Sequence, residues 1–346
     1  MKQANSSFEL RAFVTDTETC WCSSTLNHFS KLYEEEYISA GPQILNNMSA
    51  NVTVCNITTI PPNCSVNCKV DYLQGLGYST LFLLGFLINA AALYAFIAIR
   101  RSWTDTHIYM LNLNIADFSL ILFLSFRIYD AFSCLTITYF CTFLMYVHYI
   151  NMYASIFTTA AISVQRYLSI RFPLRARSWR RKKQTAFAVC LVIWVFVITA
   201  CIMVRKDNYP EKLWTCFERC KNIPHRTWSI TSVIFIGFLI PLLIVVFCST
   251  QIIRMFLKEA DKSEEKKNIV GIVTANMIVF IVCYTPIHIA FVADLFDEPQ
   301  EDWICKGTTV HTYLLWSEWI AGTNCCFDSI SYYFLLKGFY SKARNS

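Results

Sequence analysis

Seven long apolar stretches divide this chain, and they constrain its fold more than any other feature of the sequence. They run approximately over residues 76–99, 107–132, 141–170, 184–204, 228–257, 268–296 and 309–336. A helix that crosses a bilayer needs about 20 mostly apolar residues, because each residue rises about 1.5 Å through a hydrocarbon core about 30 Å thick. Closed β-barrels show short alternating strands instead. The sequence therefore predicts an all-α, seven-helix membrane bundle.

The overall composition agrees with a membrane setting. Hydrophobic residues make up 55% of the 346 residues and charged residues only 16%, whereas soluble domains contain about 25% charged residues. We divide the chain into an N-terminal tail (1–73), the seven-span region (74–336) and a short C-terminal tail (337–346). A short amphipathic helix is expected after the seventh span. No apolar stretch at the extreme N-terminus resembles a cleavable signal peptide, so the first span is expected to direct membrane insertion.

The basic residues of the loops predict the orientation. They cluster after the first span, between the third and fourth, between the fifth and sixth, and after the seventh. These residues are Arg100, Arg101, Arg171, Arg175, Arg177, Arg180, Arg181, Lys182, Lys183, Lys258, Lys262, Lys266, Lys267, Lys337, Lys342 and Arg344. The positive-inside rule makes that side cytoplasmic, although the stretch 205–226 is also basic and must lie outside. We therefore expect a plasma-membrane protein with its N-terminus outside and its C-terminus inside.

The N-terminal tail has features of an extracellular segment. It contains five N-x-S/T glycosylation acceptor sites, at Asn5, Asn47, Asn51, Asn56 and Asn63. The outer side is oxidising, so the cysteines of the tail and outer loops are expected to form disulfides. Cysteine counting alone does not give their connectivity.

Charged side chains inside the apolar spans are the candidate functional residues, because each is costly in lipid. Arg127 is the most informative of them, since a buried guanidinium suits a carboxylate or a phosphate. An internal ion pair with Asp130 or Glu318 explains it equally well, and the sequence leaves both interpretations open. If Arg127 pairs with Asp130 while no ligand is bound, an acidic ligand would enter the site by replacing Asp130 as the partner of Arg127.

Other function classes have little support. Transporters show inverted repeats and helices broken by Gly or Pro, but the chain has no visible repeat and only nine glycines. It has no His-Glu-x-x-His, Gly-x-Ser-x-Gly or P-loop motif, so we expect no enzyme activity and no required cofactor. A seven-span transporter or channel is kept as the alternative. Nucleic acid is not an expected partner, whereas membrane lipids are.

Motifs on successive spans carry a family resemblance. They are Asn89, LNLNIAD ending at Asp117, SVQRY with Arg166 and Tyr167, Trp194, Pro241, CYTP (Cys283 to Pro286), and DSISY (Asp328 to Tyr332). In this order they resemble the rhodopsin-like G-protein-coupled receptors. The stretches RYLSIRFPLRAR and NCCFDSISYYFLLKGF are most similar to the subgroup of the lysophosphatidylinositol receptor and the kynurenic-acid-responsive orphan receptor. The long, cysteine-bearing tail is a departure from that subgroup.

The resemblance implies a function and its residues. It implies coupling to a heterotrimeric G protein and an extracellular ligand. With Arg127 as the charge partner, we expect that ligand to be a small acid or an anionic lipid such as a lysophospholipid. The candidate ligand-binding residues are Arg127, His148, Tyr149, Met152, Phe217, Tyr284, His288 and Glu318. The implied G-protein-coupling residues are Gln165, Arg166, Tyr167, Pro173, Leu174 and Tyr332. The implied sodium-binding residues are Asp117, Asn151, Ser155 and Asp328.

The resemblance also implies disulfides and points to departures. Cys141 is expected to pair with Cys216, and Cys64 or Cys68 with Cys305. Gln165 stands where the family has an acidic residue, and the missing charge predicts a weaker inactive state. Tyr284, Ser329 and Ser249 replace a tryptophan, a proline and a tyrosine of the family, respectively.

Overall fold

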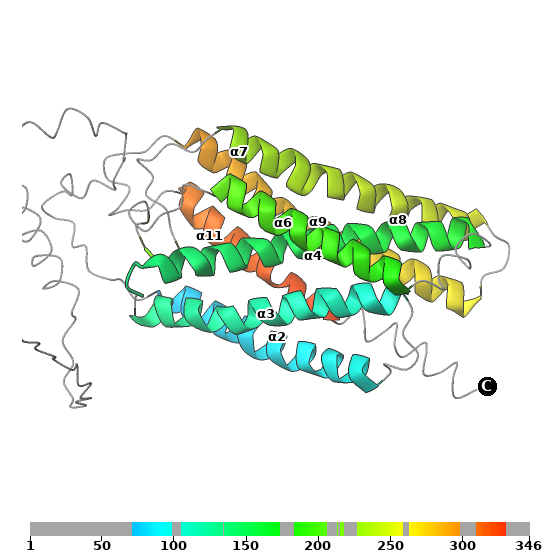
Figure 1. Ribbon diagram of the computed structural model, residues 1–346, viewed down its shortest axis with the longest axis horizontal. Helices are drawn as coiled ribbons and strands as arrows, with labels where there is room; N and C mark the ends of the chain where they lie inside the picture. The colour runs from blue at the N-terminus through cyan, green and yellow to red at the C-terminus, as the bar shows by residue number, and fades with distance from the viewer. Residues whose placement is uncertain are drawn as a thin grey trace, which may run out of the picture. The chain divides into compact units, whose positions relative to one another are not determined.

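The computed structural model describes residues 71–98, 105–133, 135–173, 183–205, 213, 215–217, 227–258, 263–297 and 309–329. Long helices run side by side through these residues (Figure 1). In chain order they are α2 (Tyr72–Ala98), α3 (Asp105–Ser133), α4 (Tyr139–Arg171), α6 (Lys183–Arg205), α7 (Thr227–Ser232), the π-helix η4 (Val233–Leu239), α8 (Ile240–Lys258), α9 (Glu264–Phe296) and α11 (Thr309–Gly322). After a turn at Thr323, residues 324–329 are helical again.

These elements confirm the all-α, seven-span prediction. The elements α7, η4 and α8 follow one another without a break and form the predicted fifth span. Helix α2 begins four residues before the predicted span and α9 also begins four residues early. Polar helix ends extend beyond the hydrocarbon core, so an apolar run marks the span more closely than the helix.

Five of the described helices are long and apolar enough to cross a membrane: Tyr72–Ala98, Asp105–Ser133, Gln184–Val204, Thr227–Lys258 and Lys266–Phe296. Helix α11 has only 14 residues before its turn. Helix α4 has 33 residues but carries many polar side chains. It contacts α3, α6, η4 and α8, and the polar side chains of its middle, among them Asn151, Ser155 and Thr158, are buried against protein.

Apolar side chains occupy both the interior and the outside of the bundle. Tyr149, Tyr153, Phe238, Phe280 and Tyr284 belong to the largest buried cluster. The outward faces carry exposed large apolar side chains, among them Leu83, Leu191 and Leu243. Such surfaces are expected where lipid is the solvent.

A π-helical segment interrupts the fifth span next to its proline. The Ile240 N–H donates to the Phe235 carbonyl, five residues back. Pro241 follows directly and has no N–H to donate. Gly237 lies within η4, and a Cβ added there would stand 2.9 Å from Cε1 of Tyr153. The close approach of η4 to α4 therefore requires a glycine at this position.

One predicted disulfide lies within the described residues. Cys141, in the first turn of α4, is bonded to Cys216, with Cα atoms 4.9 Å apart, which confirms that pairing. Both cysteines are fully buried in a small apolar cluster with Leu144 and Leu213. Cys64, Cys68, Cys305, the five glycosylation sites and the expected amphipathic helix lie outside the described residues, so these predictions stay open.

Candidate functional site

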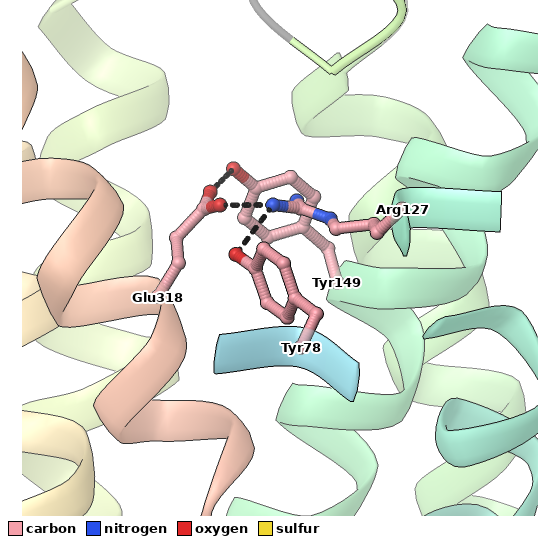
Figure 2. A network of polar contacts seen from close by, with 4 residues as sticks. All are labelled: Tyr78, Arg127, Tyr149 and Glu318. Atoms are coloured by element: carbon pink, nitrogen blue, oxygen red, sulfur yellow. Dashed lines mark hydrogen bonds and ion pairs between the residues drawn. The ribbon is translucent and has the colours of Figure 1, made fainter. Parts of the chain in front are cut away.

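A buried ion pair lies at the end of the bundle that carries the disulfide. Arg127, from α3, is 8% exposed, and its Nη1 donates to Glu318 Oε2 of α11 at 2.7 Å. The same nitrogen donates to the Tyr78 hydroxyl of α2 at 3.0 Å. The Tyr149 hydroxyl of α4 donates to Glu318 Oε1 at 3.3 Å. Figure 2 shows these four side chains converging from four helices.

The partner of Arg127 is Glu318 and not Asp130. Asp130 lies one helical turn further along α3, where its Oδ1 accepts a hydrogen bond from the Leu135 backbone N–H at 2.8 Å. The interpretation in which Asp130 neutralises Arg127 in the empty pocket is therefore wrong. The reason is local: Asp130 lies in the last turn of α3, which ends at Ser133, and its carboxylate binds the backbone N–H of Leu135, two residues past that end.

One edge of the guanidinium remains available. Among the residues that the structure describes, all hydrogen bonds of Arg127 use Nη1. The ring centroid of Phe217 lies 4.5 Å from its Cζ atom, and that of Tyr78 lies 5.5 Å away. Phe217 follows the disulfide cysteine Cys216 directly in sequence, so the bridge holds this ring against the cation. The N–H groups on Nη2 and Nε are the ones open to a further acceptor.

A second layer of the site lies between α4, η4 and α9. His288 stacks on Phe238 with ring centroids 4.2 Å apart. Its Nε2 lies 3.3 Å from the Tyr153 hydroxyl and its Nδ1 lies 2.7 Å from the Tyr284 carbonyl oxygen. A neutral imidazole that donates from Nδ1 to this carbonyl would accept from Tyr153 at Nε2.

The structure brings most of the predicted ligand residues together. Tyr149, Met152 and Tyr284 share one buried cluster. His148 packs edge-on against Tyr149, with centroids 5.3 Å apart. Three residues that contact Arg127 or His288 were not among the predicted ligand-binding residues: Tyr78, Tyr153 and Phe238. Tyr153 lies one turn from Tyr149 on the same face of α4, so helical spacing was a usable signal for it. Nothing in the sequence marks Tyr78.

Two buried carboxylates lie deeper in the bundle. Asp117 is 2% exposed and accepts from the Ser155 hydroxyl at Oδ1, 3.3 Å away. Its Oδ2 is buried with no hydrogen-bond partner among the described residues. Asp328 accepts from the Asn324 amide at 2.6 Å. Asn151 is also buried, at 4% exposure. The described residues contain no group of three or more His, Cys, Asp or Glu suited to a metal ion.

A hydrogen-bond network around Asn89 lies next to the two buried carboxylates, Asp117 and Asp328. Ser329 Oγ donates to Asn89 Oδ1 at 2.7 Å, and Asn114 Nδ2 donates to the same oxygen at 3.0 Å. The Asn89 amide donates to the Cys325 carbonyl at 3.1 Å. The network joins α2 and α3 to the 324–329 segment. Ser329 thus makes a buried polar contact at the position where the family has a proline.

A cavity lies between the acid pair and the far end of α4. Its lining includes Arg166, Ser249, Asn276 and Asp328. Ser249 is small, so its position leaves open space beside Arg166. Of the other residues expected to couple to a G protein, Tyr167 packs on Phe247 with centroids 5.9 Å apart, and Pro173 is exposed. Leu174 and Tyr332 lie outside the described residues.

Comparison with known proteins gives consistent matches. Residues 88–332 match the family model of the 7 transmembrane receptor (rhodopsin family). The chain is 32% identical to G-protein coupled receptor 35 of Mus musculus, covering 85% of this chain and 93% of that protein. It is 33% identical to lysophosphatidic acid receptor 6 of Gallus gallus, covering 80% and 94%. It is 30% identical to G-protein coupled receptor 55 of Homo sapiens, covering 81% and 90%.

Proposed function

Because the chain belongs to the rhodopsin family of seven-transmembrane receptors, which bind extracellular ligands and activate G proteins, we propose that its ligand is a small organic acid or an anionic lipid. The single observation that carries this proposal is the buried Arg127 guanidinium, whose Nη2 and Nε edge makes no hydrogen bond with the residues that the structure describes. A guanidinium binds a carboxylate or a phosphate through two parallel hydrogen bonds. Because the chain belongs to this receptor family, the alternative of a transporter or channel without G-protein coupling is not favoured.

The surroundings of Arg127 suit such a ligand. The Tyr78 and Phe217 rings lie against the guanidinium, Tyr149 adjoins Glu318, and His148 packs on Tyr149. These groups supply apolar surface with a few polar atoms, as ligand pockets generally require. Two of the similar proteins are named as receptors for lysophosphatidic acid, an anionic lipid: receptor 6 of Gallus gallus and receptor 4 of Mus musculus, the latter 30% identical. We propose that an anion is recognised here as well.

The proposal includes an orientation. The N-terminus is outside the cell, and the Arg127 end of the bundle opens to the outside. The Cys141–Cys216 disulfide supports this, because disulfides persist on the oxidising side of the plasma membrane. The basic loops then lie in the cytoplasm, next to Arg166 and the G protein.

We also propose a sodium ion beside Asp117. The fit rests on Asp117 Oδ2, which is buried without a partner among the described residues. Ser155, Asn151 and Asp328 would complete a set of carboxylate and neutral oxygens, the ligand type that hard cations prefer. The ion would neutralise charge where two acids would otherwise repel each other.

The ligand proposal is tested with Arg127→Gln. Wild type and variant are compared in a G-protein activation assay against lysophospholipids and small aromatic acids. Loss of a charge-assisted hydrogen bond of about 1.5–3 kcal/mol should cost an acidic agonist roughly tenfold or more in potency. Arg127→Lys, which keeps the charge without the planar fork, should give a smaller loss. Unchanged acid potency at normal surface expression would mean that Arg127 is only a structural partner of Glu318.

A further inference from the structure

We propose that the ligand carries a hydrogen-bond donor beside its acidic group, so that the acid binds Arg127 while the donor binds Glu318. This inference rests on the proposed function, which supplies the acid, and it adds a second chemical requirement. The ligand class becomes an acid with an adjacent ammonium or hydroxyl group, in place of an acid alone. Glu318 is then a specificity-determining residue.

Charge balance is the first reason. The side chains of Arg127 and Glu318 are 8% and 7% exposed and form an ion pair at 2.7 Å. The pair is already neutral when the pocket is empty. Adding an acid places two anions on one guanidinium in a poorly solvated site, which is unfavourable. Expelling Glu318 from the pair is also unfavourable, because it breaks a buried ion pair. A donor on the ligand resolves both problems.

The geometry of the pair is the second reason. Glu318 uses only Nη1, so the acid has access to the Nη2 and Nε edge without displacing it. The ligand acid and Glu318 then lie side by side on one planar group. A donor attached within a few atoms of the acid therefore falls within reach of Glu318.

The bonding capacity of Glu318 is the third reason. Its Oε1 accepts from the Tyr149 hydroxyl at 3.3 Å, which is long for a hydrogen bond between two oxygens. An ionised carboxylate has about four acceptor positions. A ligand ammonium or hydroxyl would therefore make a shorter hydrogen bond to this carboxylate than the Tyr149 hydroxyl does.

Two matched pairs of probes test whether the ligand is a small organic acid or an anionic lipid. The small-molecule arm compares L-tryptophan with 3-indolepropionate, which lacks the ammonium group. The lipid arm compares oleoyl lysophosphatidic acid with its 2-deoxy analogue, which lacks the hydroxyl group. Equilibrium binding is measured on the full-length receptor in nanodiscs. The donor-bearing probe should bind about tenfold or more tightly than its partner in one arm, a difference of about 1.4 kcal/mol. That arm identifies the source of the ligand.

Glu318→Gln tests the role of the carboxylate. The amide keeps the size of the side chain and an acceptor for Arg127 but removes the charge. The donor-free acid should then bind about tenfold more tightly than to wild type, and the preference for the donor should fall towards parity. Asp130→Asn is the matched control: it neutralises an acid on the helix of Arg127 that bonds to Leu135, and it should leave the preference unchanged.

The outcomes distinguish the two proposals. If donor-free acids bind as tightly as donor-bearing ones in both arms, or if Glu318→Gln weakens every probe equally, the donor requirement is wrong and the acid proposal stands. If no probe in either arm binds to wild type, both proposals fail. Should Glu318→Gln not reach the membrane, the comparison on wild type alone decides.

Discussion

The Thr106 hydroxyl donates a hydrogen bond to Gln165 Oε1 at 3.2 Å, which ties the first turn of α3 to the end of α4. Gln165 stands directly before Arg166, at the position where the family has an acidic residue. The amide therefore keeps a contact between helices that needs only an acceptor, while it leaves out the negative charge beside Arg166.

This arrangement predicts the effect of restoring the charge. Gln165→Asp should lower ligand-free G-protein activation, because a carboxylate keeps an acceptor for Thr106 and adds attraction to Arg166. One such pair contributes about 0.2–1 kcal/mol, so the decrease should be at most about fivefold. Thr106→Val is the companion variant: it removes the hydrogen bond without a change in charge, and it should raise basal activity. A rise in basal activity with Gln165→Asp would contradict this account.

Arg166 lines the cavity beside Ser249 and Asn276, and we expect it to be needed for coupling. The agonist favours a state in which this face opens to the G protein. Arg166→Ala should keep surface expression and agonist binding but lose most agonist-stimulated nucleotide exchange. Surface labelling and exchange measured on the same cells check this, and normal coupling would show that the cytoplasmic switch is assigned to the wrong residue.

Gly237→Ala should destabilise the receptor. The new Cβ would stand 2.9 Å from the buried Tyr153 ring, and forcing a methyl group into a packed interior costs about 1–3 kcal/mol. Gly271→Ala on α9 is the matched control, because nothing lies within 4 Å of a Cβ there. That change should be neutral or stabilise the helix by roughly 0.5–1 kcal/mol. The melting temperature of Gly237→Ala should therefore fall while that of Gly271→Ala stays unchanged or rises, and equal shifts would argue against a tight η4–α4 contact.

Sodium should stabilise the wild-type receptor but not Asp117→Asn. Binding to the native state raises the unfolding free energy by an amount that grows with ion concentration. Melting temperature is measured in sodium chloride against choline chloride at equal ionic strength. Ser155→Ala, which loses one neutral oxygen near Asp117, should retain a reduced response. A sodium response that persists in Asp117→Asn would place the ion elsewhere.

The sequence predicted the spans well and the partners of their polar residues less well. Span positions follow from the length of an apolar run, and polar residues inside the spans, such as Asn89, Asp117 and Asp328, are buried because lipid is a poor solvent for them. The identity of a partner depends on helix rotation and on distances between elements remote in sequence. For this reason Glu318, 191 positions from Arg127, was one of two alternatives. Tyr78 and η4 were not predicted, since neither has a local signal.

The η4 segment also affects how this chain is compared residue by residue with its relatives. A π-helical turn holds more residues than an α-helical turn, because each N–H bonds five residues back. Counting backwards from Pro241 with α-helical spacing therefore misassigns the direction of the side chains before Val233 by about one residue, or roughly 100° of rotation. When the chain is aligned to a receptor whose fifth span is α-helical throughout, a gap of one residue is needed within 233–239. Without that gap, Trp228 and Thr231 are matched to the wrong residues of the other receptor.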